Sequence, residues 1–230
     1  MKTITTIIIG TSLFFYSNTN AQISGGAQLS YLKLFGGTGI SSLGLGLKGE
    51  YAASEKVAYL GGFNYYFPEN EKYTTIANAS SSDLDPNHVD VDYEQKFNFI
   101  HIYVGAKYYF AGETAGSFGV YGLGEAGYLF APFTTTVGDV PSGYHTSLED
   151  GTENVGNLTI NFGIGGEGNI GFGYLFGDVK LNLPANQANG VEVAINIPAS
   201  ASFNAGVRVP FGDTGSSSKR RSSSKKRRRR

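Results

Sequence analysis

The sequence predicts an all-β fold: an eight-stranded antiparallel transmembrane β-barrel with short periplasmic turns and longer extracellular loops. Three observations predict it. Apolar and polar residues alternate in eight segments, the connections between these segments alternate in length, and aromatic residues gather at the segment ends. Alternation with period two is typical of a strand that has two different faces. The 33 Gly among the 230 residues disfavour long helices.

The eight segments can be justified in chain order by the residues of their apolar faces. The first four carry Ile23, Ala27, Leu29 and Tyr31 (23–35), Leu43, Leu45, Leu47 and Tyr51 (43–53), Val57, Tyr59, Phe63, Tyr65 and Phe67 (57–67), and Ile100, Ile102, Val104, Ala106, Tyr108 and Phe110 (95–110). The last four carry Phe118, Val120, Ala126, Tyr128 and Phe130 (117–131), Leu158, Ile160, Phe162, Ile164 and Ile170 (158–170), Leu175, Val179, Leu181 and Leu183 (174–183), and Val191, Val193, Ile195, Ile197, Phe203, Val207, Val209 and Phe211 (191–211). Polar residues and Gly occupy much of the opposite face of each segment.

Two architectures use such strands. A soluble sandwich buries the apolar faces against each other, whereas a membrane barrel turns them outward to lipid and lines its interior with polar groups. The connections of about 7, 3, 27, 6, 26, 3 and 7 residues favour the barrel, because membrane barrels have short turns on one side and longer loops on the other. An even number of strands also returns both ends of the barrel to the turn side.

Aromatic residues at both ends of the apolar face support the same interpretation. On the loop side lie Tyr65, Phe67, Tyr128 and Phe130, and on the turn side lie Tyr51, Tyr59, Tyr108, Phe110, Phe118 and Phe211. Two such groups fit the two headgroup levels of a bilayer. Closing the sheet would leave no unpaired edge in hydrocarbon.

The two ends of the chain differ from its middle. Residues 1–21 have Lys2, an apolar stretch near 4–16 and a small residue at Ala21, which is the layout of a secretory signal peptide. Residues 22–214 hold eight basic and 19 acidic residues, a net charge of −11. The chain has no Cys, which excludes disulfides and thiolate chemistry. We therefore predict a signal peptide at 1–21, a barrel at 22–212 and a disordered basic periplasmic tail at 213–230.

The signal peptide, the eight strands and the string "AGVRVPF" together resemble the small outer-membrane barrels of the OmpA and OmpX type of Gram-negative bacteria. In this resemblance Gly206, Val209 and Phe211 match the C-terminal signal read by the barrel assembly machinery. The resemblance implies a cell outer membrane location, contact with outer-membrane lipid, and a monomer. Two departures are Pro198, which suggests a bulge or an earlier strand end, and the 19 residues that follow Phe211.

Ionisable residues gather on the inward face. In a narrow barrel they must pair or be hydrated, so they form either a structural plug or a gated, porin-like pore for small ions. The set is Lys48, Glu50, His101, Lys107, Glu125, Glu167, Asp178, Lys180, Glu192 and Arg208.

Two loop motifs suggest further chemistry. Asp83, Asp85, Asn87 and Glu94 have the spacing of a calcium-binding loop, but His88 stands where Gly is expected, and no helix flanks the segment. We expect a solvated acidic loop, with calcium as the alternative and no other cofactor. The segment 144–150, "YHTSLED", contains a His-x-Ser pair that resembles part of the catalytic set of an outer-membrane lipid A deacylase family. Residues so close in sequence seldom converge on one substrate atom, so we expect no enzyme.

The final basic run predicts a role beneath the outer membrane rather than nucleic-acid binding, because export removes the chain from cytoplasmic nucleic acid. Its cations could bind anionic headgroups or the cell-wall polymer, and the alternatives are a solvated extension or an added segment. These cations are Lys219, Arg220, Arg221, Lys225, Lys226, Arg227, Arg228, Arg229 and Arg230. The sequence therefore predicts a non-enzymatic barrel with a structural or surface-interaction role, and a narrow channel as the alternative.

Overall fold

A computed structural model describes residues 22–36, 39–185 and 197–211. Its strands are β1 (Gln22–Leu34), β2 (Ser41–Ala52), β3 (Val57–Ala79), β4 (His88–Gly112), β5 (Phe118–Val137), β6 (Tyr144–His145), β7 (Gly151–Asn169), β8 (Tyr174–Pro184) and β9 (Ser200–Phe211). Among the described residues, no helix is long and apolar enough to cross a membrane. The predicted signal peptide, Glu192 and the basic tail lie outside these ranges.

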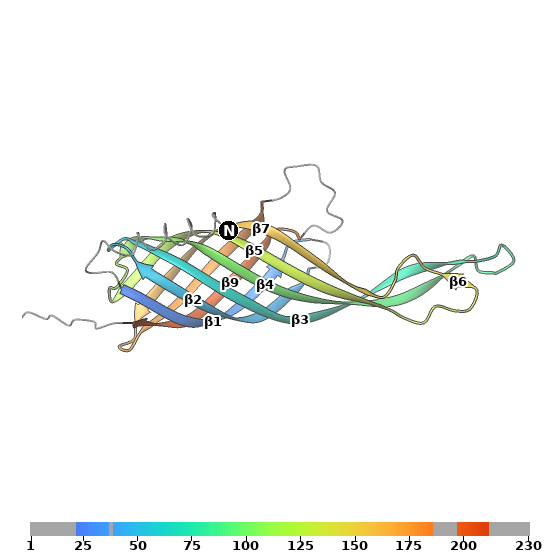
Figure 1. Ribbon diagram of the computed structural model, residues 1–230, viewed down its shortest axis with the longest axis horizontal. Helices are drawn as coiled ribbons and strands as arrows, with labels where there is room; N and C mark the ends of the chain where they lie inside the picture. Colours follow the sequence, from blue (N-terminus) through green and yellow to red (C-terminus); the bar gives the residue numbers. More distant parts are fainter. Residues whose placement is uncertain (1–21, 37–38, 186–196, 212–230) are drawn as a thin grey trace, which may run out of the picture.

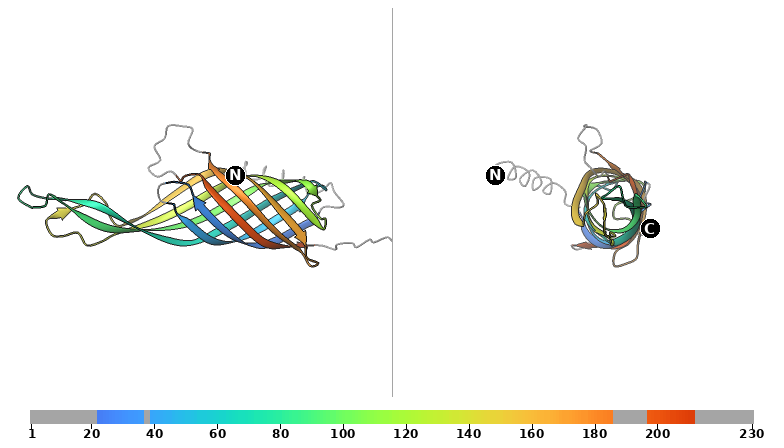
Figure 2. Two further views of the ribbon diagram at one scale, coloured as in Figure 1. Left: turned by 180° about the vertical axis from the view of Figure 1, so that it is seen from behind. Right: turned by 90° about the vertical axis from the view of Figure 1, so that its right-hand side faces the viewer.

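Eight strands form a closed antiparallel ring. Neighbours pair in the order β2-β1-β9-β8-β7-β5-β4-β3, and an additional β2–β3 pairing joins the two ends of this series. β1 and β9 pair from Ile23 with Phe211 to Leu34 with Ser200, and an end-on view shows the ring (Figure 2). The predicted fold class is confirmed.

Both described ends of the barrel lie at the rim of the short connections. Gln22 at the start of β1 pairs with Ala52, where the 53–56 turn begins, and Phe211 pairs with Ile23 at the same rim. The other short connections, 113–117 and 170–173, join strands at this end too. We call it the turn rim and the opposite end the loop rim.

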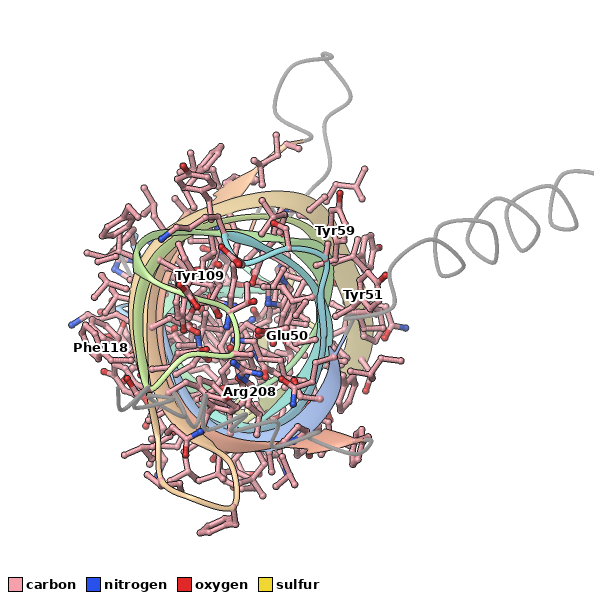
Figure 3. All side chains as sticks on the ribbon, turned by 90° about the vertical axis from the view of Figure 1, so that its left-hand side faces the viewer. Glu50, Tyr51, Tyr59, Tyr109, Phe118 and Arg208 are labelled. Carbon is pink, nitrogen blue, oxygen red and sulfur yellow. The ribbon has the colours of Figure 1, made fainter. Side chains whose placement is uncertain are left out.

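The wall of the barrel is inside out relative to a soluble protein. Along β2, Leu43, Leu45 and Leu47 are exposed while Lys48 and Glu50 are buried. The same alternation runs along β7, where Phe162 is exposed and Asn161 is buried. Figure 3, which looks into the turn rim, shows Tyr51, Tyr59 and Phe118 outside the wall and Glu50, Tyr109 and Arg208 within it.

The predicted strand bounds 57–67, 95–110, 117–131 and 158–170 are too short, because most residues of the two long connections are strand. β3 and β4 have 23 and 25 residues, and β5 and β7 have 20 and 19, whereas β1 has 13. These four strands continue beyond the loop rim as a twisted sheet (Figure 1). We call residues 67–98 and 131–157 the projection. The short β6 pairs with the end of β3 through Asn78 and Ala79.

The predicted last strand, 191–211, is also too long. β9 begins at Ser200, and Pro198 lies before it in irregular backbone. Since proline cannot donate to a strand ladder, an earlier strand boundary was one of the two outcomes expected from it. Residues 191–196 of that prediction lie outside the described residues.

Candidate functional site: the lumen and the projection

The turn-rim half of the lumen holds a network of four ionised side chains from four strands. Lys107 of β4 lies with its Nζ 2.6 Å from Glu50 Oε2 and 3.3 Å from Glu167 Oε2. Arg208 of β9 donates to Glu167, with Nε 3.3 Å from Oε2, and lies 3.5 Å from Glu50 Oε1. Each cation therefore contacts both carboxylates, and all four side chains are buried. We call this set the turn-rim network.

Two further pairs lie in the lumen. Lys48 Nζ is 3.2 Å from Asp178 Oδ2, and Lys180 Nζ is 3.0 Å from Glu125 Oε2. Among the described residues, the buried charges are thus four cations and four carboxylates, and the interior carries no net charge with His neutral. Because an unpaired buried charge is costly, this balance lets every one of the eight buried charges have a partner of opposite sign.

Each of these four cations also lies over an aromatic ring. The Lys107 ammonium is 4.1 Å from the centroid of Tyr121, and the Arg208 guanidinium carbon is 4.2 Å from that of Tyr174. Lys180 and Lys48 make the same contact with Tyr103 and Phe176, at 4.1 and 4.4 Å. Cation–π attraction adds to the ion pairs, and the rings fill the lumen.

Glycines make room for these rings. A Cβ on Gly165 would lie 2.6 Å from Cε2 of Tyr121, closer than real Cβ contacts allow, and a Cβ on Gly62 would meet the Tyr103 hydroxyl. Both glycines stand on the inward face of their strands. A side chain at either position would displace a ring from its cation.

A connection at the turn-rim mouth is hydrogen-bonded to its neighbour and to the network beneath it. Thr114, in the turn between β4 and β5, is buried, and its carbonyl accepts from Arg208 Nη2 at 3.1 Å. Its amide donates to the Glu55 carbonyl and its hydroxyl to the Ser54 carbonyl, at 3.0 and 2.8 Å. The turns 53–56 and 113–117 are therefore joined to each other and to the network below.

The loop-rim half of the lumen is mainly apolar, although its wall also carries the buried polar side chains of Ser42, Asn157, Asn182, Ser200 and Ser202. A cluster of buried side chains fills it, which we call the apolar plug: Leu32, Leu34, Ile40, Tyr66, Phe99, Leu129, Ala131, Phe133, Val155 and Ile197. Between the plug and the charged half lies a polar layer in which the Gln28 amide donates to Asn64 and to the Tyr103 hydroxyl, at 2.7 and 3.1 Å. The lumen thus changes from charged to polar to mainly apolar along its length.

The structure places nine of the ten inward-facing candidates inside the lumen, and Glu192 lies outside the described residues. Eight of the nine form the ion pairs above. The ninth, His101, is buried against Thr159 and Asn161, 3.3 and 3.4 Å from its Nε2. Sequence reasoning missed the rings of Tyr174 and Phe176, which lie beneath cations, and the apolar plug as a group. Extending the inward parity of each strand to its loop-rim end would have found the plug residues that lie within strands. Ile197, predicted on the outward apolar face, is instead buried in the plug, because it lies before β9 begins.

The other candidates do not form sites among the described residues. The tip between β3 and β4 holds Asp83, Asp85 and Asn87. Glu94 lies within β4, where it is the cross-strand neighbour of Lys72 in β3. No cluster of three or more potential metal ligands occurs in the described part of the chain. His145 Nδ1 lies 3.3 Å from the Ser80 hydroxyl, and Ser147 and Glu149 follow in irregular backbone.

The assembly-signal residues lie on β9 at the closing seam. Val209 and Phe211 face outward and are exposed. Gly206 pairs with Gln28 of β1, and a Cβ there would meet the backbone of β1. The ring of Phe211 covers Gly25, because a Cβ built on Gly25 would lie 2.7 Å from Cε2 of that ring.

The projection is an acidic surface whose base shares Ala131, Phe133 and Val155 with the apolar plug. It contains 11 acidic residues and two lysines, a net charge of −9 with His neutral. Tyr73 and Tyr93 stack across β3 and β4 with centroids 5.3 Å apart. Burial raises the pKa of Tyr73, and the nearby Glu71 carboxylate raises it further.

No family model and no curated protein sequence matches the chain. Solved structures do. A major outer membrane protein of Thermus thermophilus is 13% identical with a TM-score of 0.52, over 83% of this chain and 99% of that one. The chain has the fold of a small outer-membrane β-barrel. Other similar structures are the attachment invasion locus protein Ail of Yersinia pestis (16% identity, TM-score 0.44, 83% of this chain and 97% of that one) and Neisserial surface protein A (14%, 0.46, 84% and 99%).

The outer-membrane barrel explains the exposed apolar wall. A closed ring satisfies its backbone groups internally, and an apolar exterior around a charged interior is the arrangement that a bilayer requires. The predicted barrel fold is thereby confirmed, and its exposed apolar wall fits the predicted location in the cell outer membrane.

Proposed function

We propose that this outer-membrane barrel is non-enzymatic and non-conducting, and that it holds the acidic projection outside the cell as an interaction surface. The observation that carries the proposal is the length of β3, β4, β5 and β7, which continue past the loop rim into a sheet that no bilayer covers. A barrel with a purely structural role needs no such extension.

The filling of the lumen supports closure over conduction. An ion entering from the turn rim meets the bonded Thr114 turn and then the neutral turn-rim network. Beyond the polar layer it meets the apolar plug, whose mostly hydrocarbon side chains replace little of the hydration of an ion. We expect purified protein in planar bilayers to show no channel events. Stable unitary currents would overturn the non-conducting part of the proposal.

The orientation can be tested directly because the chain has no Cys. Ser82→Cys places a thiol at the exposed tip between β3 and β4, and Glu113→Cys places one in a turn of the opposite rim. On intact cells a membrane-impermeant maleimide should label the first variant and not the second. After the outer membrane is permeabilised, both should react. Labelling of Glu113→Cys alone on intact cells would refute the proposed display.

The basic tail gives the barrel a proposed partner on its other side. The last described residue, Phe211, lies at the turn rim, so in the proposed orientation the tail starts in the periplasm. Its nine cations between Lys219 and Arg230 would bind anionic headgroups or cell-wall polymer, each contributing about 1 kcal/mol near an anionic membrane. Truncation after Gly215 should release the protein from sedimented cell wall or anionic vesicles at low salt. Unchanged sedimentation would refute the tether.

A further inference from the structure

One edge of the projection lacks a strand partner. β3 pairs with β4 as far as Asn78, but on its other side β2 reaches only Tyr66 and β6 pairs only with Asn78 and Ala79. Among the described residues, no strand pairs with this side of β3 between Pro68 and Ala77. Alternate backbone amides and carbonyls of that stretch therefore face outward.

The open edge has two halves with different protection. Its first half contains Pro68, Glu69, Glu71 and Lys72, the residue types that keep natural edge strands from pairing with other chains. Its second half is the uncharged run Tyr73–Ala77, "YTTIA", in which four of five residues are aromatic or β-branched and favour strands. The second half is thus an unprotected template for another strand.

Contacts with β4 fix the conformation of the unprotected half. Tyr73 stacks on Tyr93 of β4, and the Thr74 hydroxyl donates to Asp92 at 3.3 Å. Beyond it, the Ser80 amide donates to the Gly143 carbonyl at 2.8 Å, which ties the tip to the 138–150 segment. A strand that is already extended loses little conformational freedom when it pairs, which favours binding.

The acidic residues of β4 favour a positively charged segment at the open edge of β3. Asp90, Asp92 and Glu94 of β4 pair with Ile76, Thr74 and Lys72, so these acids lie one strand in from the open edge, on the face that carries the exposed Ile76. Long basic side chains of an added strand can reach across β3 to them. A second copy of this chain presents the same charge of −9 and is repelled.

We infer that the β3 edge at Tyr73–Ala77 accepts an extended, cationic segment of a partner protein as an additional strand of the projection. Backbone hydrogen bonds provide the affinity of such strand addition, and the β4 carboxylates provide the preference for Lys and Arg. This inference rests on the proposed function and names the class of partner.

The test uses the full chain in lipid nanodiscs and a fluorescent ten-residue peptide of alternating Lys and Val. Fluorescence polarisation should show saturable binding. A peptide of equal charge, with Pro in place of alternate Val, cannot pair along its backbone and should bind at least about tenfold more weakly. Equal binding of the two peptides would overturn strand addition in favour of charge attraction alone, and absence of binding by the Lys-Val peptide would overturn the inference altogether.

Variants locate the binding edge. Ile76→Lys puts a positive charge at the edge and should weaken binding about tenfold. Thr152→Lys is the matched control, because it adds the same charge at an exposed position on β7, three strands from the open edge and opposite Thr134 rather than a β4 acid. Equal weakening by both would exclude the β3 edge. Hydrogen exchange gives a second readout: the Lys-Val peptide should protect alternate amides within Tyr73–Ala77, and unchanged exchange there would overturn the assignment.

The outcome is separable from that of the proposed function. Peptide binding in nanodiscs does not depend on which side of a cell the projection faces. Loss of peptide binding with normal tip labelling would refute only the β3 edge, whereas absence of tip labelling on intact cells would refute the display.

Discussion

The two halves of the lumen are closed by different chemistry. Near the turn rim, Lys107 and Arg208 each contact both Glu50 and Glu167. Near the loop rim, the apolar plug fills the lumen with side chains whose packing depends on volume and shape rather than on a particular partner. A buried charge depends on one or two partners of opposite sign, while an apolar side chain shares its contacts among many neighbours. The charged half should therefore be the less tolerant of a single change.

The largest expected effect is that of Lys107→Met. It leaves Glu50 and Glu167 with only Arg208 as a cation within 4 Å among the described residues, and it removes the contact with Tyr121. Breaking a buried pair by removing one partner costs about 3–5 kcal/mol. Urea unfolding in detergent, followed by the mobility of unboiled samples on gels, measures the loss.

The matched control for that change is Lys56→Met. Lys56 lies in the β2–β3 turn at the same rim, and its Nζ donates to the Gly112 carbonyl at 2.6 Å in an exposed position. One exposed hydrogen bond contributes about 1 kcal/mol or less. Equal losses in the two variants would show that the buried network has no special weight.

The plug should respond more moderately. Leu129→Ala removes a buried side chain of the plug and should cost about 3 kcal/mol, since transfer and cavity terms add. The other plug side chains, such as Phe99 and Phe133, and the turn-rim network stay in place, so planar bilayers should still show no current. Currents in this variant would mean that the plug, rather than the network, is the ion barrier.

A double substitution in the lumen separates the effect of charge from that of packing. Lys180 and Glu125 form a pair that shares neither partner with the turn-rim network. Lys180→Met alone leaves a buried carboxylate, whereas adding Glu125→Gln removes both charges and keeps an oxygen for the Asn161 amide. Because replacing a whole buried pair is often neutral, the double variant should unfold within about 1 kcal/mol of the parent. A loss as large as that of the single variant would contradict this.

The sequence shows which side chains of a strand face outward and which face inward. It does not show which inward side chains from different strands contact each other. Period two at Leu158–Phe162 identifies which side chains face lipid. It does not reveal that Lys48 meets Asp178, 130 residues away, because the partner depends on how neighbouring strands are staggered around the ring. The sequence predicts loops in place of the projection for a related reason. Outside the bilayer neither face of a strand must be apolar, so Glu69–Lys72 carries no alternation although it is paired with β4.

The smallest expected effect lies in the projection itself. Thr134 and Thr152 face each other across β5 and β7 with their hydroxyl oxygens 3.0 Å apart, in a pair open to solvent. Water can replace either hydroxyl, so Thr134→Val with Thr152→Val should change the free energy of unfolding by about 0.5 kcal/mol or less. The measurement is the same urea titration used for Lys107→Met. A loss above about 2 kcal/mol would contradict this, because it would give an exposed hydroxyl pair the weight of a buried contact.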